Sequence, residues 1–114
     1  MLFSLTTRHP AHHNAFVRAT QLLQERIVYS ERAFAEVVVW KLAAPVLGSR
    51  HPFKYRLAFV MDGKCVLRFD NEAGKGDHLH LSGREGHYKF STIEQLLADF
   101  QAEIRRILDE DSHS

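Results

Sequence analysis

The fold is decided by the segment Lys54-Tyr55-Arg56-Leu57-Ala58-Phe59-Val60-Met61, which continues through Asp62-Gly63 into Lys64-Cys65-Val66-Leu67-Arg68-Phe69-Asp70. Large apolar side chains occupy every second position of its first part: Tyr55, Leu57, Phe59 and Met61. The alternation resumes after the Asp-Gly pair, at Cys65, Leu67 and Phe69. A period of two is typical of a half-buried strand, and Asp-Gly between two such runs indicates a hairpin. The sequence therefore predicts strands over 54–61 and 64–70.

The register of this hairpin depends on its turn. A three-residue loop over 61–63, with Gly63 left-handed, keeps the apolar side chains of both strands on one face. It pairs Phe59 with Cys65, Leu57 with Leu67, Tyr55 with Phe69, Arg56 with Arg68 and Lys54 with Asp70. Because like charges directly opposite are destabilising, the two arginines would then need an anionic ligand or neighbouring carboxylates.

The residues before this hairpin allow two readings. Val37-Val38-Val39-Trp40 is β-branched and aromatic, which favours a strand. We expect a first hairpin with strands over 20–29 and 33–42. A helix over 15–26 is the alternative to its first strand, because apolar residues there also fit one helical face.

The residues after the hairpin predict one or two short strands and a helix. Strands are expected over 77–81 or 87–90, with a turn from Gly83 to Gly86. Ser91-Thr92-Ile93-Glu94 fits a capping box, in which Ser91 would cap a helix over 92–108. Apolar residues follow at helical spacing: Ile93, Leu96, Leu97, Phe100, Ile104, Ile107 and Leu108.

These elements predict an α+β fold, with an antiparallel sheet of about four to five strands. The C-terminal helix would pack on the sheet face that carries Tyr55, Leu57 and Phe59. The chain of 114 residues fits one globular domain over 19–114, and residues 1–18 are expected to be a flexible extension or an added arm.

Composition favours a soluble, cytoplasmic protein. The single cysteine, Cys65, excludes an internal disulfide framework and fits a reducing compartment. No apolar run approaches the roughly 18 to 20 residues that span a membrane, and the start of the chain lacks the pattern of a signal peptide. The formal net charge is +1, but the segment 41–68 is basic and the segment 92–111 is acidic. A basic middle segment favours anionic partners such as RNA.

Chemically active residues are densest from Phe69 to His80. His78 and His80, two apart on a strand, would project to one side about 6 to 7 Å apart. One could act as base and one as acid in metal-independent RNA cleavage, oriented by Asp70 or Asp77. Cationic and polar groups would hold the phosphate: Arg56, Arg68, Lys75, Asn71, Gly74 and Gly76. This reaction needs no cofactor.

Two other functions fit the same residues. His78-x-His80 and a nearby carboxylate could form the metal site of a hydrolase, although this motif is short and unspecific. Alternatively, Gly74-Lys75-Gly76 could cradle a phosphate in a nucleic-acid or phosphate-binding module without catalysis.

The most specific run is Asp70-Asn71-Glu72-Ala73-Gly74-Lys75-Gly76-Asp77-His78-Leu79-His80, preceded by Tyr55-Arg56-Leu57 and Asp62-Gly63 and followed by Tyr88-Lys89-Phe90. In this order of motifs, from Ala19 to Arg105, the chain resembles the TumE-like family of small toxins. The resemblance implies a type II toxin–antitoxin pair, whose antitoxin is a helix-turn-helix protein from the same operon. Association into a homo-oligomer stays open.

Overall fold

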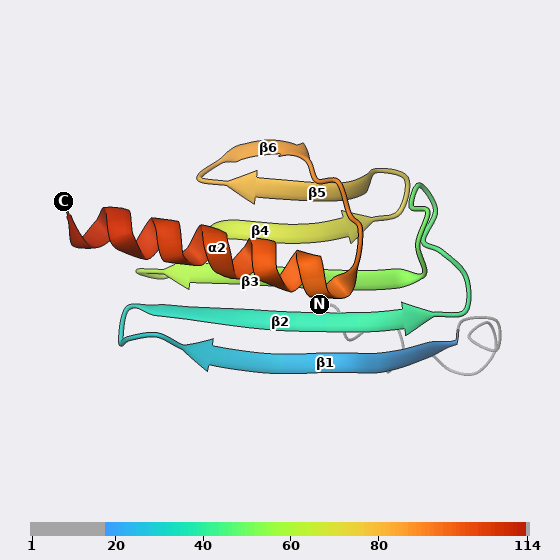
Figure 1. Ribbon diagram of the computed structural model, residues 1–114, viewed down its shortest axis with the longest axis horizontal. Helices are drawn as coiled ribbons and strands as arrows, with labels where there is room; N and C mark the ends of the chain where they lie inside the picture. Colours follow the sequence, from blue (N-terminus) through green and yellow to red (C-terminus); the bar gives the residue numbers. More distant parts are fainter. Residues whose placement is uncertain (1–17, 114) are drawn as a thin grey trace.

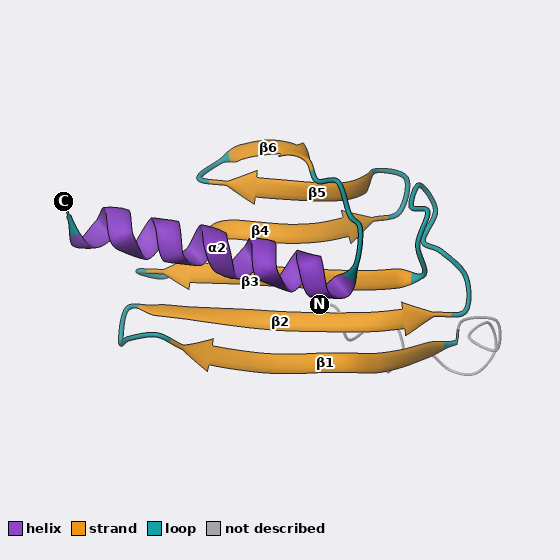
Figure 2. Ribbon diagram, viewed as in Figure 1, coloured by secondary structure: helices purple, strands orange, loops and turns teal. Residues whose placement is uncertain are grey.

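The protein is an antiparallel sheet with a long helix across one face. The computed structural model describes residues 18–113, in which six strands follow one another in sequence order, β1-β2-β3-β4-β5-β6 (Figures 1 and 2). The elements are β1 (Ala19–Val28), β2 (Ala33–Leu42), β3 (Phe53–Met61), β4 (Lys64–Glu72), β5 (Gly76–Leu81), β6 (Arg84–His87) and α2 (Ile93–Ser112). The α+β prediction is confirmed, with six strands in place of four to five. The predicted extension lies, except for Arg18, outside the described residues.

The first hairpin is confirmed. β1 pairs with β2 from Ala19 opposite Leu42 to Val28 opposite Phe34. The alternative helix is therefore wrong over 19–26, while residues 15–17 lie outside the described range. Pairing explains the outcome, because β1 satisfies its backbone groups against β2 and packs Leu23 and Ile27 against the core.

The turn between β3 and β4 has two residues, not three. Asp62 and Gly63 both have positive φ, 52° and 77° respectively. Positive φ at both central positions is what a type I′ turn requires. A register shift then leaves Val66 as an extra residue in β4, which is a β-bulge. Together the turn and the bulge bring the apolar faces into phase, with Leu57 opposite Phe69 and Phe59 opposite Leu67.

The predicted β3–β4 register is consequently wrong, and the error matters for the charges. Arg56 lies opposite Asp70, while Arg68 lies opposite Ala58. The sheet thus places a carboxylate, and not a second guanidinium, across from Arg56. The predicted Arg56–Arg68 and Lys54–Asp70 pairs do not occur.

The last strand begins earlier than predicted. Ser82 and Gly83 have φ of 49° and 84° and form a two-residue turn, so β6 starts at Arg84. The predicted turn over 83–86 and strand over 87–90 are wrong, because this tight turn returns the chain at once to pair with β5. His87 then lies opposite His78, and Glu85 opposite His80.

The helix begins and ends later than predicted. Thr92 is the N-cap, and its side chain accepts a hydrogen bond of 3.0 Å from the Gln95 amide. The capping residue is therefore not Ser91, although a hydroxyl caps the helix as expected. At the other end, Arg106 pairs with Glu110 over 2.8 Å. Such a pair four residues apart supports a helix that continues past residue 108. Within the described range, no helix is long and apolar enough to cross a membrane.

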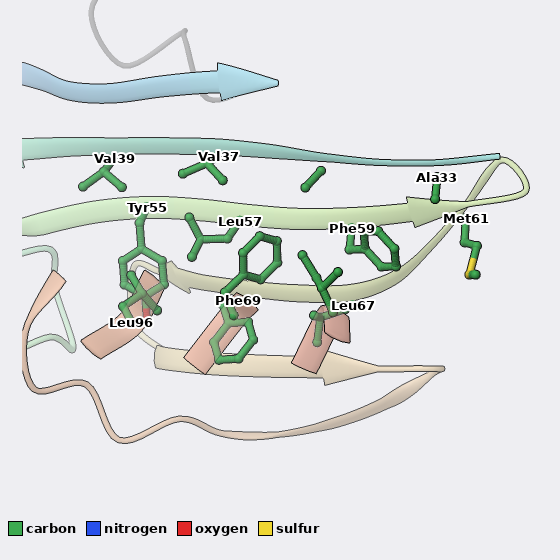
Figure 3. Close-up of a cluster of buried hydrophobic side chains, with 13 residues drawn as sticks. Ala33, Val37, Val39, Tyr55, Leu57, Phe59, Met61, Leu67, Phe69 and Leu96 are labelled. Atoms are coloured by element: carbon green, nitrogen blue, oxygen red, sulfur yellow. The ribbon is translucent and has the colours of Figure 1, made fainter. Parts of the chain in front are cut away.

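The core lies between α2 and the sheet, as predicted. Leu96, Phe100 and Ile104 of the helix are buried against the face of the sheet that carries Tyr55, Leu57 and Phe59. Figure 3 shows these sheet residues together with partners from β2 and β4. The buried apolar cluster consists of Ala33, Ala35, Val37, Val39, Tyr55, Leu57, Phe59, Met61, Leu67, Phe69, Leu96, Phe100 and Ile104.

Candidate functional site

Polar residues gather on the sheet face opposite α2, which we call the helix-free face because no helix within residues 18–113 lies on it. Alternation along the strands directs Arg56 to this face, since Tyr55 and Leu57 point into the core. The strand register then aligns two rows across β3 to β6. The first row is Arg56, Asp70, His78 and His87, and the second is Ala58, Arg68, His80 and Glu85. The sheet thus brings together residues that lie far apart in the sequence.

Asp70 is the carboxylate at the centre of this group and is buried. Its Oδ2 lies 2.9 Å from Arg68 Nε, and its Oδ1 lies 3.8 Å from His80 Nε2. The Arg68 contact is an ion pair without hydrogen-bond geometry, and Oδ1 accepts no hydrogen bond from the described residues. Asp70 therefore keeps an acceptor available beside an imidazole.

His78 is held on both sides. Its Nε2 lies 2.7 Å from the carbonyl oxygen of Lys75. Since a carbonyl only accepts, Nε2 carries the hydrogen. The other ring nitrogen, Nδ1, is buried and lies 3.2 Å from Glu85 Oε2, an ion-pair contact without hydrogen-bond geometry. Nδ1 is therefore the nitrogen of this ring that can exchange a proton.

His80 is the more accessible of the two histidines. Its side chain is 25% exposed, against 10% for His78, and their ring centroids are 6.3 Å apart. Its Nε2 lies 4.0 Å from Glu85 Oε2, which is beyond hydrogen-bond distance. The predicted spacing of the two imidazoles is confirmed, and His80 is the ring that a ligand can reach.

Glu85 and His87 complete this group, and the sequence analysis missed both. Glu85 approaches both histidines, and the His87 ring centroid lies 5.4 Å from that of His78. The sequence pattern that could have indicated both residues is the alternation after Gly83, which places Glu85 and His87 on one side of a four-residue strand. Assigning this stretch to a turn concealed it.

Arg56 has an unpaired charge. Its guanidinium makes no hydrogen bond or ion pair with any residue in the described range, although it is half-buried and lies opposite Asp70. Arg68 remains 31% exposed beside its carboxylate partner. The helix-free face thus offers two guanidinium groups next to two imidazoles, a combination suited to a phosphate.

Asp77 and Asn71 lie apart from this group. Asp77 Oδ1 accepts hydrogen bonds from Tyr55 Oη at 2.7 Å and His51 Nε2 at 2.9 Å, on the side of the sheet that faces α2. Asn71 is fully buried, where it accepts a bond from the Tyr55 amide at 3.0 Å and donates one to the Phe53 carbonyl at 2.7 Å. Both side chains fasten β3 to its neighbours, and neither lies on the helix-free face.

The buried Tyr55–Asp77 bond gives a stability prediction. Burial, and then the bond to Asp77, raise the pKa of Tyr55 above its ordinary value, since both disfavour the phenolate. We expect Tyr55→Phe to lower the free energy of unfolding by about 1.5 to 3 kcal/mol, the usual range for a bond to a charged group. Because the folded-state pKa of Tyr55 is raised, its stabilising contribution should be lost as pH rises above about 10, where the unfolded tyrosine ionises.

Urea unfolding at pH 7 and at alkaline pH measures both effects. Tyr29→Phe is the control, because Tyr29 is exposed and its hydroxyl has no hydrogen-bond partner in the described range. If Tyr55→Phe behaves like this control, the bond to Asp77 does not stabilise the fold.

The Gly74-Lys75-Gly76 loop is occupied by contacts within the protein. The Gly74 amide donates to the Leu47 carbonyl at 2.6 Å, and the Lys75 amide donates to the Glu72 carbonyl at 3.0 Å. A Cβ on Gly76 would lie 3.1 Å from the Gly48 carbonyl oxygen. Close packing against residues 46–49 therefore explains Gly76 without a phosphate, while the Lys75 ammonium lies 3.8 Å from a Glu72 carboxylate oxygen and is mostly exposed.

The described residues do not form a metal centre. Between positions 18 and 113, no three or more His, Cys, Asp or Glu side chains are arranged so that they could hold a metal ion. The His-x-His pair is thus present on one side of β5, but the third ligand expected from the sequence is not in place around it.

The fold and the site define a small α+β protein whose helix-free sheet face carries paired imidazoles and guanidinium groups. Its particular family follows from comparison with known sequences, since residues 7–108 match the family described as Toxin TumE. The chain belongs to this toxin family and is a toxin of a toxin–antitoxin system, with an antitoxin as its partner. Neither the curated proteins nor the solved structures include a significant match.

Proposed function

We propose that this toxin acts on RNA and cleaves it without a metal ion, using the helix-free face as its active site. The observation that carries the proposal is the clustering of His78, His80, Arg56 and Arg68 on one side of adjacent strands. Cleavage at a ribose 2′-hydroxyl needs a base, an acid and cations around the phosphorane. This cluster contains all three kinds of group within a few strands.

The geometry suggests distinct roles. His80 is the more accessible of His78 and His80 and would exchange a proton with the substrate, with Asp70 beside it. His78 would be the second acid–base group through its Nδ1, and Glu85 would orient that nitrogen. Arg56 and Arg68 would bind the scissile phosphate. This assignment keeps both predicted histidines, Arg56 and Arg68. It leaves out Lys75, whose ammonium lies beside Glu72, and it replaces Asp77 by Glu85 as the second carboxylate.

The partner that controls such a site is proposed to be a helix-turn-helix antitoxin from the same operon. The support is membership of a toxin family together with the resemblance of the Asp70–His80 run. Sequencing the genes beside this one tests the type of antitoxin. An unrelated neighbouring gene product that neutralises the toxin would replace this part of the proposal.

Arg56→Gln provides a test of the active site that does not touch the histidines. We expect the specificity constant for cleavage of a mixed-sequence RNA oligonucleotide to fall about 10- to 100-fold, the effect of losing one charge-assisted bond of roughly 1.5 to 3 kcal/mol. EDTA should leave the wild-type rate unchanged, and an oligonucleotide of the same sequence with 2′-deoxy sugars should not be cleaved.

Lys89→Gln is the matched control, because Lys89 is an exposed cation outside the cluster. If EDTA abolishes the cleavage rate and a divalent ion restores it, the protein is a metal-dependent hydrolase. If the wild-type protein binds RNA but does not cleave it, the protein is a nucleic-acid-binding module without catalysis.

A further inference from the structure

The two edges of the sheet differ. β6 has four residues, whereas β1 has ten and, among residues 18–113, pairs only with β2. Long edge strands are usually protected by Pro, Lys, bulges or covering segments. β1 contains neither Pro nor Lys. A register shift leaves a bulge at Leu22, but the pairing with β2 is regular from Leu23 to Val28. It also exposes Leu22 and Val28, so this edge is suited to receive another strand.

A groove runs beside this edge on the side of α2. It consists of two neighbouring hollows of about 90 and about 340 Å³, which share Tyr29 and Gln101. Leu23, Ile27 and Leu97 are among the side chains that line the first hollow. Ile104 and Leu108 extend the apolar lining into the second. We call this the edge groove.

One cation on the rim of the edge groove has no partner among residues 18–113, although two carboxylates, Glu25 and Asp109, also line the groove. Arg105 lines the larger hollow and makes no hydrogen bond or ion pair with residues 18–113, whereas the next residue, Arg106, pairs with Glu103 and Glu110. A ligand of the groove would therefore combine apolar side chains with a carboxylate placed to meet Arg105.

We propose that β1 and the edge groove form the docking site of the antitoxin. An extended antitoxin segment would add as a seventh strand beside β1. Its alternate apolar side chains would enter the edge groove, and one acidic side chain would pair with Arg105. This inference rests on membership of the toxin family, which supplies the antitoxin as partner, and it does not depend on RNA cleavage.

A second copy of the chain fits the edge less well. The regular part of β1 is centred on Glu25 and Arg26. A symmetric antiparallel β1–β1 pair centred on either residue, with both helices on one side, would place like charges directly opposite each other, which is destabilising. The antitoxin has no such constraint.

Two substitutions in exposed helix residues test the proposal. Gln101→Trp should fill the groove, and Arg105→Glu should repel the acidic side chain. The probe is the full antitoxin encoded beside this gene. Each variant should still arrest growth when expressed alone, but its affinity for the antitoxin should fall at least tenfold, so that co-expression no longer restores growth. Ala102→Trp and Lys89→Glu are the matched controls and should be neutralised normally.

Hydrogen exchange of the wild-type protein supplies a second readout that needs no variant. Every second amide of residues 23–28 points away from β2, because β1 is an edge strand of the antiparallel sheet. These outward amides should exchange fast in the free toxin and become protected in the complex. Unchanged exchange on binding, or unchanged affinity of both variants, would overturn the proposal. Protection of these amides already in the free toxin would also overturn the proposal. Light scattering would then show what covers the edge: a second copy if the toxin is a dimer, or the chain's own residues if it is a monomer.

Discussion

Replacement of His80 by alanine is expected to lower the rate of RNA cleavage by about 10²- to 10⁴-fold, the usual contribution of a general acid or base. His80 is more accessible than His78 on the helix-free face, and Asp70 Oδ1 lies 3.8 Å from its Nε2. Because the variant retains Arg56 and Arg68, RNA affinity should change little. The loss should therefore appear in kcat and not in KM.

The same assay distinguishes acid–base catalysis from a structural role. Since one histidine must be protonated and the other neutral at the start of the reaction, the wild-type rate should follow a bell-shaped pH profile, and His80→Ala should remove one limb. His113→Ala is the matched control, because His113 is exposed beyond the far end of α2. A rate that survives both His78→Ala and His80→Ala would refute the acid–base reading.

Phe100→Ala should have the largest effect on stability, a loss of about 3 to 5 kcal/mol in the free energy of unfolding. Phe100 is 2% exposed, and its ring meets that of Phe69 edge to face at 5.8 Å. Truncation would leave a cavity between α2 and β4 that neither rigid element can close. Since the free energy of unfolding of a whole domain is only about 5 to 15 kcal/mol, this single substitution would remove much of the stability of the protein.

Urea unfolding measures this loss, and the midpoint should shift without a change in slope. Gln101→Ala, at the next position of the helix, is the control because Gln101 is exposed. Its effect should stay within about 0.5 kcal/mol, as is usual for surface substitutions. A loss below about 1 kcal/mol for Phe100→Ala, well under the range for buried aromatic residues, would mean that α2 does not pack on the sheet through this face.

The sequence could predict those parts of the molecule that depend on local periodicity. Alternation over 54–70 indicated the central hairpin, and helical spacing of Leu96, Phe100 and Ile104 indicated the face of α2 that enters the core. The same alternation placed His78 and His80 on one side of a strand. These inferences held because side-chain direction follows from backbone geometry alone.

The sequence could not fix features that depend on which residues meet across strands. The two-residue turn and the bulge at Val66 together change the partner of Arg56 from the predicted Arg68 to Asp70, and no local pattern signals the bulge. A left-handed Ser82 starts β6 early and so delivers Glu85 to the histidines. Helical spacing also gave Leu97 the same weight as Leu96, but only packing decides that Leu97 lines the edge groove.

The sequence by itself thus determined the fold class, the direction of the apolar faces of β3, β4 and β5, and the toxin family. Tertiary structure alone decided the composition of the candidate site, because Asp77 and Asn71 point to the opposite side of the sheet and bond to Tyr55. It also decided the position of the edge groove, where we propose that the antitoxin docks. The physical reason is that periodicity sets the side to which a side chain points, whereas register, turns and packing set what it meets there.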